Sequence, residues 1–283
     1  MSNLIEELFC ANRMLRGELW VAESVLVNFP SLDQPNALVN YAMAINANVC
    51  FFDYTNLAGT DSKNMIPFQN AVDRAHVNGL ACGALIDGPF ERLVRNLGFF
   101  KVMQAFRDDS LLNNLLHEQT IKVNGDIELA KSSNVDMCIL CDDIAYKQGP
   151  YFSPQVFSQI FAPLYRDLIK VIGPEIIAGF HSDGNLSLLF PKLQEIGFTM
   201  FSLEPEAMDL VNHPLCITGL VTLLTGIKAS WLTAPEWGQR QLDEIKKYIS
   251  HLRRRYRLIL ASTCGIQDMQ SMRRLQDIYQ TVL

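Results

Sequence analysis

The 283-residue chain lacks a long apolar run, and no stretch of eighteen apolar residues occurs in it. A membrane-spanning helix needs about 20 such residues, so no membrane span is expected. The start of the chain lacks the basic segment of a secretory signal peptide, because Glu6 and Glu7 come early. The seven cysteines are scattered through apolar stretches without the spacing of a disulfide framework. We therefore expect a reduced, cytoplasmic protein.

Positive charge is also in short supply. The chain has 24 lysines and arginines against 30 acidic residues, which gives a net charge of −6. Basic residues are dispersed, apart from the run 253–255, which is typical of a solvated helix end where positive charge suits the helix dipole. A nucleic-acid-binding protein would show a basic face, so nucleic acid is not expected as a partner. The sequence does not fix the oligomeric state, and a homodimer remains open.

Several motifs of known chemistry are absent. The glycines match neither a dinucleotide-binding fingerprint nor a phosphate-binding Walker loop, and no nucleophilic serine elbow is present. Cys138 and Cys141 have the spacing of a metal or redox pair, but they lie on an apolar run that predicts a strand. Residues three apart on a strand point to opposite faces. We therefore predict core packing, with Cys141 alone reaching the end of its strand.

The chain does contain a regular alternation of apolar runs and amphipathic segments. After a helix predicted over residues 4–16, the runs that favour strands are 18–27, 48–53, 80–86, 135–141, 175–180, 198–203, 214–219 and 256–262. Helical patterns separate them, with no linker or composition break. This alternation predicts an α/β fold, a single-domain (β/α)8 TIM barrel over residues 1–283, with residues 1–45 as a short N-terminal extension or the first barrel unit. An open doubly wound sheet is the alternative.

Polar side chains gather where the predicted strands end. They are Asp53, Asp142, Asp143, His181, Asp183, Glu204 and Cys264. In a parallel barrel the carboxyl ends of the strands ring a single mouth, where the chemistry of such folds takes place. Imidazole, thiolate and carboxylate are all zinc ligands, and a catalytic zinc uses three of them. A structural interpretation stays open beside this one: His181 caps a strand and Asp183 caps the next helix.

Four segments carry a resemblance to a known family. Residues 143–157, 180–185, 195–209 and 86–90 resemble the uroporphyrinogen decarboxylase superfamily. The resemblance extends over about residues 45–283, and its central part, 142–209, is the most specific. It implies a (β/α)8 barrel, in agreement with the alternation of strands and helices.

One branch of that superfamily consists of decarboxylases. They bind the acidic side chains of a porphyrinogen through an N-terminal arginine motif and place an aspartate after an early strand. Asp53 stands in that aspartate's place, but the only arginines before it are Arg13 and Arg16. Cys264 stands where the decarboxylases have a histidine. A site for a substrate with many carboxylates is poor without arginines, because each buried carboxylate needs a charge partner.

The chain is more similar to the second branch, the corrinoid-linked methyltransferases of the methylcobalamin:coenzyme M type. These bind zinc through a His-x-Cys pair and a later cysteine. The resemblance therefore implies His181, Asp183 in place of the first cysteine, and Cys264 as metal ligands. A carboxylate is a competent zinc ligand. The implied partner is a separate protein that carries the corrinoid.

The resulting hypothesis is a zinc-dependent methyltransferase. It would move a methyl group between a small-molecule donor or thiol acceptor and a protein-bound corrinoid. The candidate catalytic residues are Asp53, Asp143 and Glu204, and the candidate substrate-binding residues are Tyr146 and Asp142. Two alternatives remain: a metal-independent decarboxylase that uses Asp53, and a non-catalytic member that binds a corrinoid protein or a small molecule.

Overall fold

A computed structural model describes residues 4–11, 14–59, 62–262 and 264–282. Eight parallel strands form one sheet in the order β1-β10-β9-β8-β7-β4-β3-β2. They are β1 (Met14–Arg16), β2 (Val49–Asp53), β3 (Ala81–Asp87), β4 (Met137–Cys141), β7 (Ile177–Ser182), β8 (Met200–Leu203), β9 (Thr222–Ile227) and β10 (Arg257–Ser262). A parallel bridge between Gly17 and Val49 brings the two edges of the sheet together. The (β/α)8 barrel predicted from the sequence is confirmed.

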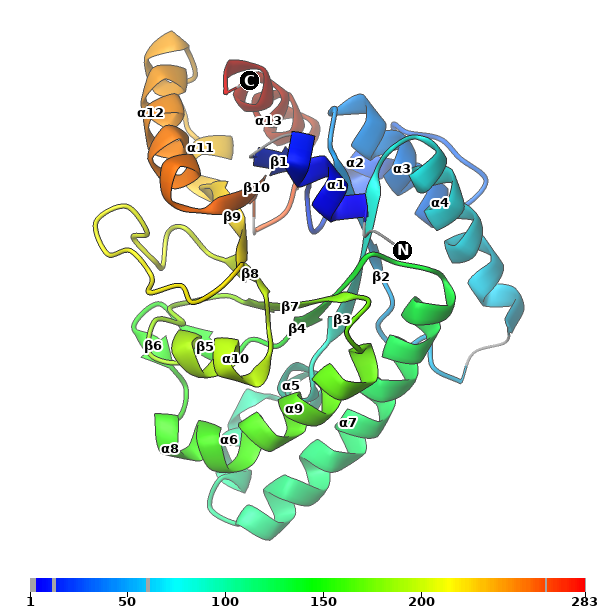
Figure 1. The fold of residues 1–283 in the computed structure, drawn as a ribbon, viewed down its shortest axis with the longest axis vertical. Coiled ribbons are helices and arrows are strands. Elements are labelled where there is room, and N and C mark those ends of the chain that lie inside the picture. Colours follow the sequence, from blue (N-terminus) through cyan, green and yellow to red (C-terminus); the bar gives the residue numbers. More distant parts are fainter. Residues whose placement is uncertain (1–3, 12–13, 60–61, 263, 283) are drawn as a thin grey trace.

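Helices surround this barrel, as Figure 1 shows. They include α3 (Gln34–Ala44), α4 (Ile66–Val77), α5 (Pro89–Leu97), α7 (Asp109–Ser132), α9 (Ala162–Ile172), α10 (Phe190–Ile196), α12 (Gln239–Arg255) and α13 (Met269–Thr281). The others are α1 (Leu4–Ala11), α2 (Glu23–Leu26), α6 (Phe99–Ala105), α8 (Pro154–Val156), α11 (Ala229–Leu232), the 3-10 turn η1 (Ser62–Met65) and the π-helical turn η2 (Phe157–Phe161). Two short strands, β5 (Ala145–Tyr146) and β6 (Gly149–Pro150), pair as an antiparallel hairpin after β4.

Side chains at the N-cap position, just before the first turn, explain where two of these helices begin. The carboxylate of Asp108 accepts the backbone N–H of Leu111 at the start of α7, and the hydroxyl of Ser153 accepts that of Val156 at the start of α8. An N-cap of this kind satisfies one of the backbone donors that the first turn leaves unpaired. Aspartate and serine are both among the residues preferred at this position, which explains why the two helices begin where they do.

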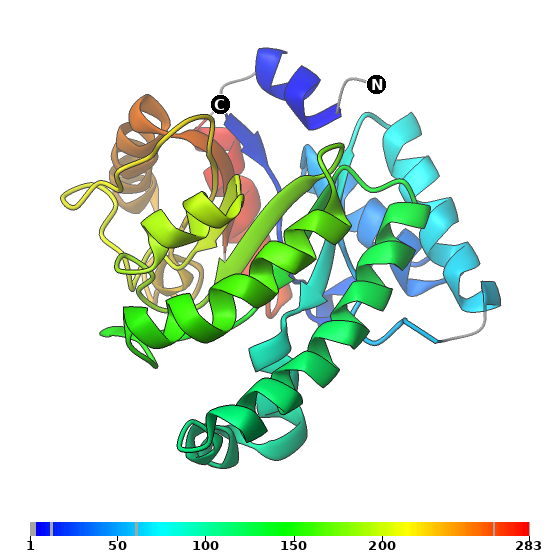
Figure 2. The same cartoon turned by 60° about the horizontal axis from the view of Figure 1, so that its bottom comes forward.

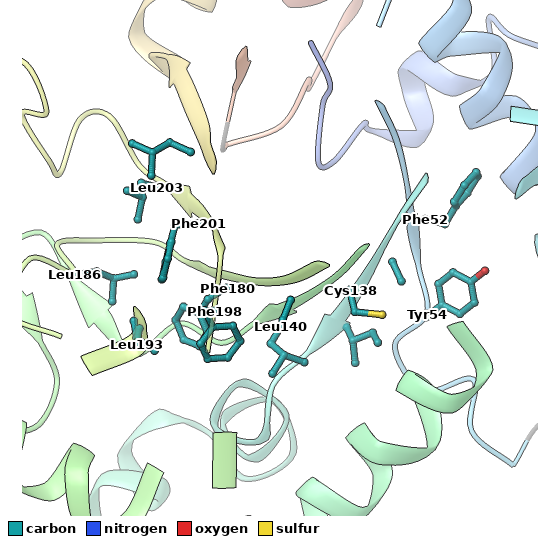
Figure 3. Close-up of a cluster of buried hydrophobic side chains, with 14 of the residues drawn as sticks. Phe52, Tyr54, Cys138, Leu140, Phe180, Leu186, Leu193, Phe198, Phe201 and Leu203 are labelled. Carbon is teal, nitrogen blue, oxygen red and sulfur yellow. The ribbon is translucent and has the colours of Figure 1, made fainter. Parts of the chain in front are cut away.

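Alternation along the strands produces two separate cores. On β4, Cys138 and Leu140 pack outward under the helices, whereas Met137 and Ile139 fill the barrel interior. Successive side chains of a strand point to opposite faces, so each strand serves both layers. Figure 3 shows part of the outer layer, in which Phe180, Phe198 and Phe201 gather with leucines of neighbouring elements. The prediction that Cys138 packs in the core is confirmed.

Helix α1 lies across the amino-terminal end of the barrel, as Figure 2 shows. Its Ile5 is fully buried against the interior layer, which includes Leu15 and Val49. The Arg257 guanidinium at the start of β10 bonds both carboxylate oxygens of Glu6, at 2.9 and 2.7 Å, and lies 3.8 Å from the ring centre of Phe9. Apolar burial and this charged clamp together close that end of the barrel.

Three sequence predictions near the strands are wrong in detail. The helix predicted over 4–16 ends at Ala11, residues 12–13 lie outside the described part, and residues 14–16 form β1. The strand predicted over 18–27 contains the short helix α2 and a single bridge at Val21 instead. The seventh strand is β9, over 222–227, because residues 214–219 pass over the surface and only the next apolar run enters the barrel. None of the helices in the described residues has the length and apolarity needed to cross a membrane.

Candidate functional site

A pocket of about 510 Å³ opens at the carboxyl ends of β2, β3, β4 and β7. The apolar part of its lining comes from the segment after β1, from the loop after β2, from α3 and α4, and from inward-facing strand residues: Leu19, Trp20, Val21, Leu26, Leu38, Phe51, Leu57, Phe68 and Leu85. The polar part consists of Gln34, Asp53, Thr55, Asp87, Glu91, Arg95, Cys141, Asp143 and His181. This is the mouth that the strand-end residues predicted.

His181, near the end of β7, has two ring nitrogens with different surroundings. Its Nδ1 lies 2.8 Å from the hydroxyl oxygen of Ser202 on β8, within hydrogen-bonding distance. Its Nε2 faces two carboxylates, 4.0 Å from Oδ1 of Asp143 and 3.8 Å from Oδ1 of Asp183. The imidazole is mostly buried, whereas both carboxylates are partly exposed. The hydrogen bond to Ser202 therefore orients the ring so that Nε2 points at the two acids.

Backbone hydrogen bonds hold the loop that carries these acids. Asp143 accepts the N–H of Asp183 at 2.8 Å, and Glu204 accepts the N–H of Gly184 at 2.9 Å. Burial raises the pKa of Asp183 above its usual value, and the nearby Asp143 and Glu204 add to this rise while His181 opposes it. Like charges that are held together in this way favour a cation between them.

Asp143, His181 and Asp183 form one group of potential metal ligands, whose atoms lie within 4.8 Å of one another. Ligand atoms on one tetrahedral zinc lie about 3.3 Å apart, as follows from bond lengths of about 2.0–2.2 Å. The observed separations of 3.8 and 4.0 Å are slightly wider, and rotation of the partly exposed carboxylates would close them. The donor set of one imidazole and two carboxylates therefore fits a zinc ion.

Cys264, the third ligand predicted from the sequence, belongs to a different group. Its thiol lies with the carboxylates of Glu204 and Glu206, within 4.8 Å of one another, on the exposed rim. In the described part of the chain, no group of three ligand atoms within that distance joins Cys264 to His181. The following Gly265 has a φ of +71°, and a Cβ there would lie 2.5 Å from the Trp20 ring. Only glycine fits between Cys264 and this pocket residue.

Asp142 is turned away from the mouth. It is fully buried, and its carboxylate accepts N–H groups of Phe90 and Glu91 at the start of α5 and the hydroxyl of Tyr165. Burial raises its pKa to about 7, against the effect of these donors. Its oxygens are engaged in fixing α5 and are turned away from the pocket, so the predicted role of Asp142 in substrate binding does not fit the structure.

The other two predicted site residues lie at the rim. Asp53 ends β2, lines the pocket and accepts the N–H of Thr55 at 2.8 Å. Tyr146, on the hairpin after β4, is half-exposed and stacks on Tyr151 with ring centres 5.5 Å apart. Its carbonyl accepts the N–H of Asn185 at 2.9 Å, which places the hairpin beside the loop after β7.

Sequence reasoning did not include Asp87, Glu91 and Arg95 in the site. Asp87 directly follows an apolar run, so the strand-end rule that selected Asp53 applies to it as well. Burial raises the pKa of Asp87 to about 6, and the charge of Arg95 opposes this rise. The Arg95 Nε lies 3.1 Å from Asp87 Oδ2 and 2.9 Å from Glu91 Oε1. No sequence pattern indicates Glu91 and Arg95 as site residues, because they lie on α5 and only the fold turns their side of this helix toward the pocket.

A third group of possible ligands lies at the opposite end of the strands. Asp136 precedes β4, and its Oδ2 lies 2.9 Å from His76 Nε2 and accepts the N–H of Cys82 at 2.7 Å. Burial raises the pKa of the Cys82 thiol well above its usual value, which disfavours the thiolate that a metal needs. We interpret this group as a structural tie between α4 and the strands.

Comparison with known proteins supports the fold. No protein-family model and no curated protein sequence matches the chain. Among solved structures, a methyltransferase from Methanosarcina mazei is similar over 100% of this chain and 98% of its own, with a TM-score of 0.70 and 13% identity. A putative vitamin-B12 independent methionine synthase from Listeria monocytogenes matches with a TM-score of 0.59 and 12% identity, over 95% of each chain. D-psicose 3-epimerase from Clostridium cellulolyticum H10 matches with a TM-score of 0.56 and 10% identity, over 95% of this chain and 98% of its own. At these identities the likeness is one of fold alone.

Proposed function

We propose that this barrel is a zinc-dependent methyltransferase whose reaction takes place at the mouth. The methyl group would move between a small molecule in the pocket and a corrinoid carried by a partner protein. The observation that carries the proposal is the arrangement around His181, whose Nε2 faces Asp143 and Asp183 at the edge of a pocket of about 510 Å³. An oriented imidazole with two carboxylates and an open side is the arrangement of a catalytic zinc.

The comparisons lend this proposal support at the level of the fold. One similar structure is a methyltransferase, and another is a putative methionine synthase, so this architecture accommodates methyl transfer in other proteins. Sugar epimerases share the same architecture, so the argument for methyl transfer also needs the residues at the mouth. The corrinoid and its carrier protein rest on the sequence resemblance.

The polar residues around His181 have distinct parts in this proposal. Bound zinc would supply Lewis acidity, which lowers the pKa of a thiol or polarises a methyl-bearing atom. His181 and Asp183 hold it, and Ser202 keeps the imidazole in place. Glu204 fixes the Gly184 amide and so the loop that presents Asp183. Asp143 and Cys264 are the two candidates for the third ligand, and the first is nearer to His181 in this arrangement.

Metal content of the purified protein tests the proposal. We expect about one zinc per chain in the wild type, by elemental analysis. If Asp143 is the third ligand, Asp143→Asn loses most of the zinc and Cys264→Ser retains it; if Cys264 completes the set, the reverse holds. Cys216→Ser, which changes another exposed cysteine, is the matched control. A wild type that binds no added zinc contradicts the proposal.

The decarboxylase alternative fits the pocket less well. Among the described lining residues, four are carboxylates and one, Arg95, is an arginine, already engaged by Asp87 and Glu91. A substrate with several carboxylates would meet repulsion there, with little charge to offset it. A non-catalytic binder remains the outcome to infer if zinc binds but no methyl donor reacts with a corrinoid.

A further inference from the structure

The charge and the shape of the mouth pocket point to the class of substrate that it binds. We propose that the pocket binds an organic cation that carries methyl groups, such as a quaternary ammonium, as the methyl donor. The role of the cation as methyl donor rests on the proposed function. Binding of the cation does not rest on it, because binding is measured separately.

The pocket has an excess of acidic side chains. Asp53, Asp87, Glu91 and Asp143 line the pocket, and Arg95 is the single arginine among the described lining residues. If Asp143 is assigned to the metal, three carboxylates still face one guanidinium. Asp53 forms no ion pair within the described residues, and its carboxylate is exposed to the pocket. The pocket therefore keeps an excess of negative charge that a cation would balance.

Asp87 has a buried carboxylate oxygen without a hydrogen bond from the described part of the chain. This residue is 8% exposed, and its Oδ2 accepts no hydrogen bond from any described residue. The Arg95 Nε is 3.1 Å away but is directed at Glu91, whose Oε1 accepts its hydrogen bond at 2.9 Å. One guanidinium thus serves two acids, and a buried carboxylate oxygen is left with charge compensation but without a hydrogen bond. Such an oxygen is suited to an additional cation.

The lining of the pocket also has an aromatic part. Trp20, Phe51 and Phe68 belong to it, and Trp20 is 51% exposed. Aromatic faces attract cations through the ring quadrupole, and methyl groups on the cation pack against aliphatic side chains. A small inorganic cation would gain nothing from the apolar side chains, whereas a neutral apolar molecule would gain nothing from the acids. A methylated ammonium can contact both.

Methyl transfer from such a donor breaks one bond to carbon and forms another. When the methyl group leaves, the carbon–nitrogen bond breaks and both of its electrons remain on nitrogen, which departs as a neutral amine. The electron pair for the new bond to carbon comes from the reduced, cobalt(I) corrinoid of the partner protein. The leaving amine has lost the positive charge of the donor. Its attraction to the acidic residues of the pocket is therefore weaker after transfer, which favours release.

Calorimetric titration with choline and its neutral analogue 3,3-dimethylbutan-1-ol tests the proposal. The two probes have the same shape and differ in charge. We expect choline to bind about tenfold more tightly or better, and Asp53→Asn and Trp20→Leu each to weaken choline binding about three- to tenfold. Glu175→Gln, which removes an exposed acid away from the mouth, is the control and should leave binding unchanged.

Equal binding of both probes, or no binding of choline, would overturn the inference, as would unchanged affinity in both mouth variants. The titration is run on metal-free and on zinc-loaded protein. Cation binding without zinc binding would retain this inference and reject the proposed function. Zinc binding without cation binding would reject this inference and retain the proposed function.

Discussion

At the scale of single residues, the strand-end rule predicts that His181, Asp183 and Asp143 lie at one end of the barrel, and the structure brings their side chains together there. The rule could not decide which strand ends meet across the mouth. Cys264 was placed with His181 from the family resemblance, whereas the fold puts its thiol beside Glu204. The distance between two loops depends on their full conformations, and no residue spacing contains that information.

Ser202 offers a test of how His181 is oriented. Ser202→Ala removes the partner of Nδ1 and leaves the ring free to turn away from Asp143 and Asp183. We expect zinc affinity to fall by about 10- to 100-fold, as for other losses of a ligand's hydrogen-bond partner. Competition with a chromophoric chelator measures it. Ser158→Ala, at an exposed position, is the control, and equal zinc affinity in the two variants would contradict the role given to Ser202.

At the scale of elements, Asp142 shows why neighbouring acids behave differently. Successive residues leaving a strand diverge, so Asp143 faces the mouth while Asp142 enters the layer beneath α5. In the sequence both acids follow the same apolar run, and only one of two successive residues can face the mouth. Which one did so depended on the register of β4, and a register error of one residue reverses the assignment.

The close packing of Gly88 against Asp142 leads to a prediction about stability. A Cβ at position 88 would lie 2.3–2.5 Å from atoms of the buried Asp142 side chain, so Gly88→Ala must displace the cap of α5. We expect a loss of about 2–4 kcal/mol in the free energy of unfolding. Urea denaturation measures it. Gly238→Ala, where the nearest atom would be 3.8 Å away, is the matched control and should change stability by less than about 1 kcal/mol.

Glu18 connects three elements through a buried carboxyl group. It accepts the N–H of Ser262 at the end of β10, at 3.1 Å, and the hydroxyl of Tyr279 on α13, at 2.9 Å. Burial raises its pKa from 4.5 to about 8. The folded protein therefore retains a proton that the unfolded chain releases above about pH 4.5. Its contribution to stability falls as the pH rises from there and becomes constant above about pH 8.

Glu18→Gln should remove this dependence. We expect the free energy of unfolding of the wild type to decline by a few kcal/mol between pH 5 and pH 8 relative to that of the variant. Urea unfolding across this pH range measures the difference. Glu23→Gln, an exposed acid of the same segment, should follow the wild type. Parallel pH profiles for wild type and Glu18→Gln would show that Glu18 is ionised in the folded protein.

At the scale of the whole molecule, the barrel was predictable because eight apolar runs alternate with helical patterns over the entire chain. The errors fell on the shortest elements. β1 has three residues, too few for a periodic signal, and it is defined by pairing with β10 and by the bridge to β2. The apolar run at 214–219 was as plausible a strand as 222–227, and only the geometry of the sheet selects between them.

The closure of the amino-terminal end by α1 has its own test. Ile5→Ala removes a fully buried side chain from the interior layer, and we expect a loss of about 2–4 kcal/mol in the free energy of unfolding. Ile66→Ala, at a side chain that is 51% exposed, should cost less than about 1 kcal/mol. Zinc content should stay at the wild-type level in both, because neither residue touches the mouth. Equal destabilisation in the two variants would contradict the role of α1 as a buried cover.

The closure of the amino-terminal end by α1 also affects the order in which reactants bind and leave. Side chains fill the barrel interior and α1 covers its far end, so the pocket at the mouth does not continue through the barrel. A protein bound over the mouth would keep a small molecule in the pocket and would block the entry of another. In the proposed reaction, visits by the corrinoid carrier must therefore alternate with exchange of the small molecule. A large excess of the carrier would then slow turnover instead of speeding it.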